Sequence, residues 1–217
     1  DSKEIKWVVN YQIATLKRAN NQPAVKGVKN IIAVTSGKGG VGKSSVSVNL
    51  ALALQAQGAR VGILDADIYG PSIPHMLGAP HQRPTSPDNQ HITPIKAYGL
   101  SANSIGFLMD EDNATIWRGP MASSALSQLL NETLWDSLDY LVIDMPPGTG
   151  DIQLTLSQQI PVTGAVVVTT PQDIALLDAV KGVSMFERVS VPVLGIVENM
   201  SMHICSNCGH HEAIFGT

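Results

Sequence analysis

Cysteine, positive charge and long apolar runs are all scarce in this sequence. The 217 residues include two cysteines, and the 14 Lys and Arg are outnumbered by 18 Asp and Glu, for a formal net charge of −4. No apolar run approaches the roughly 20 residues of a membrane-spanning helix, and no basic-then-apolar leader opens the chain. We therefore expect a cytoplasmic protein with neither a membrane nor nucleic acid among its partners.

The two cysteines lie close together, in Cys205-Ser206-Asn207-Cys208. This is too sparse for a secreted disulfide framework. C-x-x-C with nearby histidines allows half of a zinc site, a redox pair, or ligands of an iron–sulfur cluster. The redox pair is the weakest of these, because thioredoxin-type pairs open a helix and Gly209 follows this one. Spacing alone leaves open a zinc ion completed by two of His203, His210 and His211, and a metal shared with a second subunit.

Short apolar segments alternate with helical ones from Ile31 onward, which is the pattern of β-α-β units. The apolar segments lack strict alternation, as is typical of strands that helices cover on both faces. We predict an α/β fold, a mostly parallel twisted sheet with helices on both faces. The six prolines between Tyr69 and Pro94 exclude a regular helix or a central strand there. The predicted strands are residues 31–35, 61–65, 100–105, 140–144, 165–169 and 193–198, and the predicted helices are 45–57, capped by Gly58, 121–130, 152–159 and 174–188.

A glycine-rich stretch fits the phosphate-loop template G-x-x-x-x-G-K-S/T, between a predicted strand and a predicted helix as the motif requires. Its glycines let backbone N–H groups point at a phosphate, and the helix N-terminus adds partial positive charge. Lys43 would reach the β- and γ-phosphates of ATP, and the Ser44 hydroxyl would ligate Mg²⁺. The predicted nucleotide-binding residues of the loop are Gly37, Lys38, Gly39, Gly40, Val41, Gly42, Lys43, Ser44 and Ser45.

Aspartates follow two of the predicted strands, where ligands bind in folds of this kind. Asp144 ends strand 140–144, the position of an aspartate that holds Mg²⁺, usually through water, opposite Ser44. Asp65 and Asp67 end another strand, and we expect one to anchor the loop while the other faces the nucleotide. An Asx turn would explain either residue alone. The loops starting at residues 35, 65, 144, 169 and 198 should converge on one edge of the sheet.

The second lysine of the loop, Lys38, makes it resemble the deviant phosphate loop of the ATPase class that includes MinD, ParA, the nitrogenase iron protein and the Mrp/ApbC group. In that class the extra lysine reaches across a nucleotide-sandwich dimer to the partner's phosphates, much as an arginine finger does. The resemblance implies a homodimer. It also implies that Asp67 positions the attacking water and that Asn199 reads the adenine edge, for which an amide offers both a donor and an acceptor.

Five further segments are similar to the Mrp/ApbC/Nbp-type iron–sulfur carrier ATPases. In that family the C-x-x-C pair binds a bridging 4Fe–4S cluster, which implies that Cys205 and Cys208 are cluster ligands. The segment 144–151 resembles a switch, in which Gly148 and Gly150 would allow rearrangement when the γ-phosphate is lost. The similar segments are DADIYGPSIP (65–74), WRGPM (117–121), DMPPGTGD (144–151), TTPQDIAL (169–176) and ENMS-x-x-x-C-x-x-C-G (198–209).

The resemblance implies an ATP-hydrolysing carrier that assembles a 4Fe–4S cluster or transfers it to recipient apoproteins, with zinc as a substitute in aerobic preparations. Its catalytic residues would be Lys38, Lys43, Asp67 and Asp144. Two alternatives stay open. One is a positioning ATPase of the MinD/ParA kind, against which the cysteine pair argues, and the other is a P-loop reductase or ligase relative such as the nitrogenase iron protein or dethiobiotin synthetase.

Residues 1–26 stand apart from the strand-and-helix pattern. They hold a short segment, Ile5 to Leu16, and a polar linker, which is too little for a domain. A small α+β domain often precedes the ATPase in the resembling family, so we expect residues 1–26 to be its remnant plus a linker. Residues 27–217 are predicted to form one P-loop ATPase domain, truncated at its C-terminal end because further helix and strand are expected after Thr217.

Overall fold

The computed structural model describes residues 12–108 and 119–216. Seven strands form one sheet in the order β3-β4-β2-β5-β1-β6-β7, and β8 and β9 form a separate hairpin. Every pairing in the large sheet is parallel except that of β3 with β4. The predicted α/β fold is thereby confirmed. The strands are β1 (Val28–Ser36), β2 (Val61–Asp65), β3 (Ile95–Ala97), β4 (Leu100–Ser104), β5 (Leu138–Asp144), β6 (Gly164–Thr169), β7 (Val193–Glu198), β8 (His203–Ile204) and β9 (His211–Glu212).

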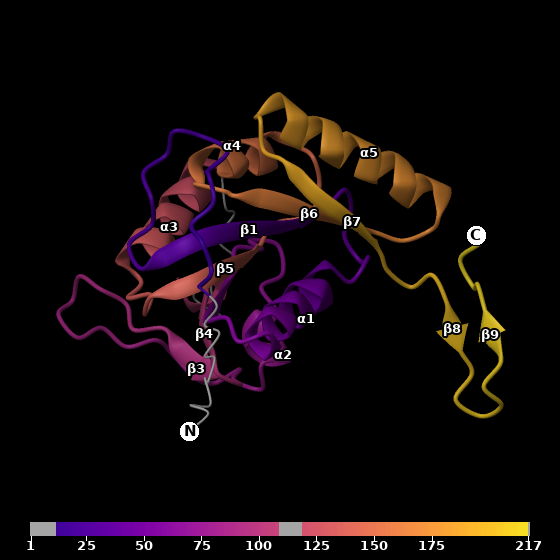
Figure 1. Cartoon of the computed structure of the whole chain (residues 1–217), viewed down its shortest axis with the longest axis horizontal. Helices are drawn as coiled ribbons and strands as arrows, with labels where there is room; N and C mark the ends of the chain where they lie inside the picture. The colour runs from indigo at the N-terminus through magenta and orange to yellow at the C-terminus, as the bar shows by residue number, and fades with distance from the viewer. Residues whose placement is uncertain (1–11, 109–118, 217) are drawn as a thin grey trace, which may run out of the picture.

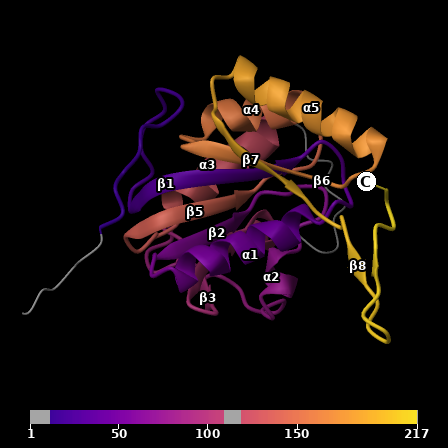
Figure 2. The same cartoon turned by 45° about the vertical axis from the view of Figure 1, so that its right-hand side comes forward.

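Helices cover both faces of the sheet (Figures 1 and 2). One face carries α1 (Lys43–Ala56) and α2 (Ile73–Met76), and the other carries α3 (Gly119–Glu132), α4 (Asp151–Gln159) and α5 (Asp173–Arg188). A short 3-10 helix, Ile105–Leu108, follows β4. On β5, Leu141 belongs to the apolar core under α3, α4 and α5, whereas the next residue, Val142, belongs to the core under α1. The absence of alternation in the sequence thus reflects burial on both sides.

The parallel strands bring distant parts of the chain to one edge of the sheet. β1, β2, β5, β6 and β7 run in one direction and end at Ser36, Asp65, Asp144, Thr169 and Glu198. Asp65 and Asp144 are direct neighbours on adjacent strands. The predicted convergence of the loops on one edge is therefore confirmed, and this edge is where a functional site is to be sought.

Several element boundaries differ from the prediction. β1 begins at Val28, before the predicted start, and α1 begins at Lys43, inside the glycine-rich loop. The exclusion of regular helix from the proline-rich stretch 69–94 is wrong over one turn, because α2 forms there. Pro74 is its second residue, where a helix needs no N–H donor. The strand predicted to end at Ile105 ends one residue earlier, and β3, β8 and β9 are short strands that carried no clear pattern.

β7 corrects the expectation that helices cover both faces of every strand. In the described part of the chain it pairs on one side only, with β6. The side chains of Leu194 and Ile196 are each 57% exposed. Aliphatic composition does not distinguish a central strand from an edge strand, so this difference could not be predicted.

Residues 12–25 hold no helix or strand, but they are bound to the domain. Asn30, at the start of β1, accepts a hydrogen bond from the Leu16 N–H (2.8 Å) and donates one to the Ala14 carbonyl (2.9 Å). The Ala19 N–H donates to the Val162 carbonyl at 2.8 Å. The predicted linker is therefore docked where it is described. Residues 1–11 of the expected domain remnant, Trp117 and Arg118 of the WRGPM segment, and Thr217 lie outside the described residues.

Within residues 12–108 and 119–216, no helix combines the length and apolar character needed to cross a membrane.

Candidate functional site

The glycine-rich loop joins β1 to α1 and borders a small cavity. Gly40 and Gly42 have positive φ angles of 80° and 84°, which a side chain would strain. The cavity has a volume of about 210 Å³ and lies against the N-terminus of α1. Its lining residues are Ser36, Gly39, Gly40, Gly42, Lys43, Ser44, Ser45, Asp67, Ser72, Met76 and Pro147.

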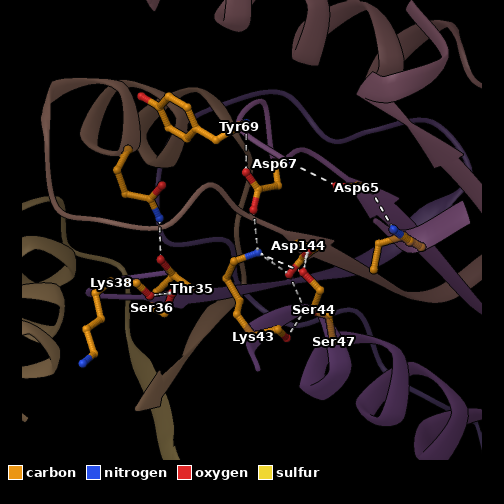
Figure 3. Close-up of polar contacts among 12 residues, drawn as sticks. Thr35, Ser36, Lys38, Lys43, Ser44, Ser47, Asp65, Asp67, Tyr69 and Asp144 are labelled. Carbon is orange, nitrogen blue, oxygen red and sulfur yellow. Dashed lines mark hydrogen bonds and ion pairs between the residues drawn. The ribbon is translucent and has the colours of Figure 1, made fainter. Parts of the chain in front are cut away.

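Lys43 pairs with two carboxylates at the ends of the neighbouring strands β5 and β2 (Figure 3). Its Nζ lies 2.8 Å from Asp144 Oδ1 and 3.3 Å from Asp67 Oδ2. The side chains of Lys43, Asp67 and Asp144 are 6%, 11% and 0% exposed. The structure therefore brings together three of the four residues predicted to be catalytic, in a cluster that is nearly closed to solvent.

Two serines of α1 donate hydrogen bonds to Asp144. The Ser44 hydroxyl donates to Oδ2 at 2.6 Å, and the Ser47 hydroxyl lies 2.7 Å from Oδ1. Hydroxyl and carboxylate oxygens are hard ligands of the kind that Mg²⁺ prefers, so the donor set of Ser44 and Asp144 fits the predicted ion. The sequence-based prediction missed Ser47. Its only signal is its place three residues after Ser44, on the same face of a helix.

Asp65 and Asp67 have different surroundings. Asp65 is fully buried: Oδ1 accepts from the Asp67 N–H (3.1 Å), and Oδ2 accepts from the Ile73 N–H (3.0 Å) and the Ser104 hydroxyl (3.2 Å). Burial, and then the charge of Asp144, raises the pKa of Asp65 to about 7. Asp67 instead uses Oδ1 to accept from the Tyr69 N–H and turns Oδ2 toward Lys43. Asp65 is thus the anchor of the loop, and Asp67 lines the cavity.

Lys38 lies apart from this cluster, with its side chain directed away from Lys43 and Asp144 (Figure 3). Its carbonyl accepts a hydrogen bond from Ser36 Oγ at 2.7 Å, and its ammonium group makes no ion pair within the residues that the structure describes. The preceding Gly37 packs against α5. A Cβ at this position would lie 2.4 Å from the Asp178 backbone, so only glycine fits. Lys38 therefore stands at the rim, next to α5, rather than in the acidic cluster.

Asn199 braces the phosphate loop from the end of β7. Its Nδ2 donates to the Val41 carbonyl at 2.9 Å, and a Cβ on Gly42 would lie 2.3 Å from the same nitrogen. The Asn199 N–H also donates to the Thr169 carbonyl, at 2.8 Å. The side chain predicted to read adenine thus contacts the loop backbone, and its role at the base stays a prediction.

The segment 144–151, predicted to be a switch, is attached to the end of β1. The Met145 N–H donates to the Val34 carbonyl (2.9 Å), and the Gly148 N–H donates to the Ser36 carbonyl (2.8 Å). At the start of α4, Gln153 Nε2 donates to Thr35 Oγ1 at 2.5 Å. Sequence reasoning missed the Gln153 contact, because nothing marks a glutamine inside a helix. These bonds join the predicted switch directly to the base of the phosphate loop.

Cys205 and Cys208 lie in the turn between β8 and β9, a hairpin that projects from the body of the domain (Figures 1 and 2). The Cys205 N–H donates to the His210 carbonyl (2.9 Å), and the Gly209 N–H donates to the Cys205 carbonyl (2.8 Å). The backbone N–H groups of Cys208 and Asn207, and then the Cys208 thiol, lower the pKa of the Cys205 thiol. Because the thiolate is the form that binds metal, this turn is suited to metal chemistry.

Among the described residues, the cysteines and histidines of the hairpin do not meet in one metal-binding group. The described residues contain no group of three or more His, Cys, Asp or Glu that could hold a metal ion, although His203, His210 and His211 share the hairpin with the cysteines. The zinc alternative that spacing left open stays a prediction.

Comparisons with known proteins bear on this arrangement. A family model described as "ParA: NUBPL iron-transfer P-loop NTPase" matches residues 27–217. The iron-sulfur cluster carrier protein of Haemophilus influenzae is 94% identical over 217 residues, which are 100% of this chain and 59% of that protein. The chain thus spans about three fifths of the length of the curated relatives it matches.

Two solved structures share the fold. The nucleotide-binding protein from Archaeoglobus fulgidus, in complex with ADP, has a TM-score of 0.77 and 41% identity, over 88% of this chain and 75% of that one. The cell division ATPase MinD of Pyrococcus furiosus has a TM-score of 0.59 and 22% identity, over 79% of this chain and 72% of that one. At that identity the second comparison supports the fold alone.

Proposed function

Since this chain belongs to the NUBPL iron-transfer P-loop NTPase family, we propose that it is an ATP-dependent carrier of iron–sulfur clusters that works as a homodimer. One observation carries the proposal. Lys43, Ser44, Asp67 and Asp144 meet beside the cavity of the phosphate loop, while both cysteines lie together on a separate hairpin. The first site suits ATP with Mg²⁺, and the second suits a 4Fe–4S cluster as cargo for recipient apoproteins.

Nucleotide binding would make Lys43 exchange its partners. Its ammonium group pairs with Asp144 and Asp67, and it would leave them for the more highly charged β- and γ-phosphates. Asp144 could then hold Mg²⁺ together with Ser44, where the ion neutralises phosphate charge. Asp67 would keep its bond to the Tyr69 N–H and turn its other oxygen to the attacking water. Movement of the Lys43 side chain would thus free Asp144 to hold Mg²⁺ and Asp67 to position water.

A short route joins the nucleotide site to the cysteine hairpin. Asn199 bonds to Val41 in the phosphate loop and lies six residues before Cys205. A shift of the loop on binding or loss of the γ-phosphate would therefore reach the base of the hairpin through one hydrogen bond. This contact supports coupling between hydrolysis and the hold on the cluster.

The cluster itself would join two subunits. A 4Fe–4S cluster takes four thiolates, and the C-x-x-C pair of one chain offers two. A two-fold axis supplies the missing pair without any other cysteine. The projection of the hairpin from the domain supports this arrangement, because it places the cysteine pair where a second subunit could meet it.

Lys38→Ala should leave ATP affinity within about threefold of wild type and lower the rate of hydrolysis tenfold or more, because the lysine acts on the partner's phosphates. Calorimetry and steady-state hydrolysis separate the two effects. The exposed Lys26→Ala is the control for loss of a lysine charge.

Mixing the Lys38→Ala and Lys43→Ala proteins tests whether Lys38 acts across the dimer. In a mixed dimer the Lys38→Ala subunit binds ATP and receives Lys38 from its partner, so part of the activity should return. No recovery, or equal loss of ATP affinity in the two single variants, would mean that Lys38 is only a phosphate ligand of its own subunit.

Asp67→Asn should keep ATP and Mg²⁺ bound and slow single-turnover hydrolysis tenfold or more, about 1.4 kcal/mol on the barrier. An amide can still accept from the Tyr69 N–H, but it cannot polarise water as a carboxylate does. Rapid-quench measurement of one turnover reports the chemical step. An unchanged rate would mean that Asp151 or the backbone, and not Asp67, positions the attacking water.

A further inference from the structure

We propose that Ser47 is a positioning residue for the magnesium-binding carboxylate of Asp144. The inference rests on the proposed function, because it concerns the state in which Lys43 has turned to a nucleotide. Ser47 lies outside the G-x-x-x-x-G-K-S/T template and does not line the cavity.

The Ser47 hydroxyl has two acceptors within reach. It lies 2.7 Å from Asp144 Oδ1 and 3.0 Å from the Lys43 carbonyl, and both Ser47 and Asp144 are fully buried. A hydroxyl donates one proton, and an ionised carboxylate is the stronger acceptor and here the closer one. The proton of Ser47 is therefore assigned to Asp144.

The two oxygens of Asp144 are held by different donors. Oδ2 accepts from Ser44, and Oδ1 is shared between Lys43 Nζ and Ser47. Once Lys43 has moved to phosphates, Ser47 is the remaining side-chain donor to Oδ1 among the described residues. The terminal torsion of an aspartate has a broad energy profile, so a carboxylate held at one oxygen can rotate. Ser47 thus fixes the plane of Asp144 in the state that takes up Mg²⁺.

If Ser47 only stabilised its helix, its substitution would have a different effect. A serine in α4 shows what such a purely structural role looks like. Ser157 is also a buried helical serine, and its hydroxyl donates to the carbonyl four residues earlier, that of Gln153, at 2.8 Å. A hydrogen bond from Ser47 to the Lys43 carbonyl alone would be an interaction of the same kind. Ser157→Ala therefore controls for the loss of a buried helical hydroxyl that touches no carboxylate.

The test compares ADP binding with and without Mg²⁺ on the whole chain. Calorimetry in EDTA and in excess Mg²⁺ gives the gain in affinity due to the ion for wild type, Ser47→Ala and Ser157→Ala. We expect Ser47→Ala to bind ADP in EDTA within about twofold of wild type and to lose about tenfold or more of the Mg²⁺-dependent gain. Ser157→Ala should keep the whole gain. In single-turnover hydrolysis, Ser47→Ala should need about tenfold more Mg²⁺ and recover most of its rate at saturation.

Two results would overturn the inference while leaving the proposed function in place. One is a Mg²⁺-dependent gain in Ser47→Ala equal to that of wild type. The other is an equal loss of affinity in EDTA and in Mg²⁺, which would assign Ser47 to the shape of the phosphate loop. If the ADP affinity of the wild-type protein were the same in EDTA and in excess Mg²⁺, the proposed nucleotide site would be refuted, and the inference with it.

Discussion

Lys43→Ala should abolish tight nucleotide binding. Lys43 is the one lysine among the described residues that lines the loop cavity, and its Nζ is already directed toward the carboxylates that would flank the phosphates. Each charge-assisted hydrogen bond to a phosphate oxygen stabilises the complex by about 1.5–3 kcal/mol. Loss of two such bonds corresponds to at least a hundredfold weaker binding. Calorimetry with ADP and with a non-hydrolysable ATP analogue measures this loss.

The same substitution also leaves Asp144 and Asp67 without their cation. Removal of one partner from a buried ion pair costs about 3–5 kcal/mol of folding free energy, so thermal unfolding must be recorded first. Addition of Asp67→Asn to Lys43→Ala removes one of the two unpaired charges and should restore part of the stability without restoring binding. An affinity within about threefold of wild type in the folded variant would contradict the role of Lys43.

Cys205→Ser or Cys208→Ser should abolish stable cluster binding and leave ADP affinity within about twofold of wild type. A serine keeps the shape of the side chain but does not form the anion that ligates iron at neutral pH. The described hairpin residues do not line the nucleotide cavity, so a cysteine substitution should not change ADP binding. Anaerobic reconstitution with iron and sulfide, followed by absorbance and Mössbauer spectra, gives the cluster content, and calorimetry gives ADP affinity.

Histidine variants provide the control for the cysteine result. His210→Ala and His211→Ala remove the neighbouring imidazoles without touching a thiol, and both should retain about four irons per dimer. A tightly held zinc ion, one per monomer, that persists after anaerobic reconstitution and disappears on histidine substitution would contradict a shared cluster.

The phosphate loop was predictable from the sequence because its chemistry depends on local spacing. Glycines at positions with positive φ, a lysine and a serine at fixed offsets are visible in one short window. Asp144 was predictable for the same reason, since it ends an apolar strand. The parallel sheet followed from the alternation of strands and helices, but the order of its strands came only from the structure.

The features that no local pattern shows depend on contacts between distant residues. Nothing local distinguishes Asp65 from Asp67, and the division between anchor and cavity residue rests on the Ile73 and Ser104 donors. Asn199 carries no mark of its bond to Val41, which lies 158 residues away. The role proposed for Ser47, on α1, likewise depends on its contact with Asp144, at the end of β5. The exposure of β7 depends on which elements lie beside it. The composition of the strand itself does not encode this.

The projecting hairpin would also set the way in which the proposed cargo leaves. β8 and β9 are two residues each, and all residues from Ser206 to Glu212 are exposed. A cluster held there by the pairs of two subunits would lie among exposed residues, where an incoming thiolate could approach it between the four ligands. Release could then proceed by associative ligand exchange, in which each entering sulfur replaces one leaving sulfur, and the iron never loses a coordination position to water. The rate of such handover would follow the concentration of the acceptor and not the unfolding of the donor.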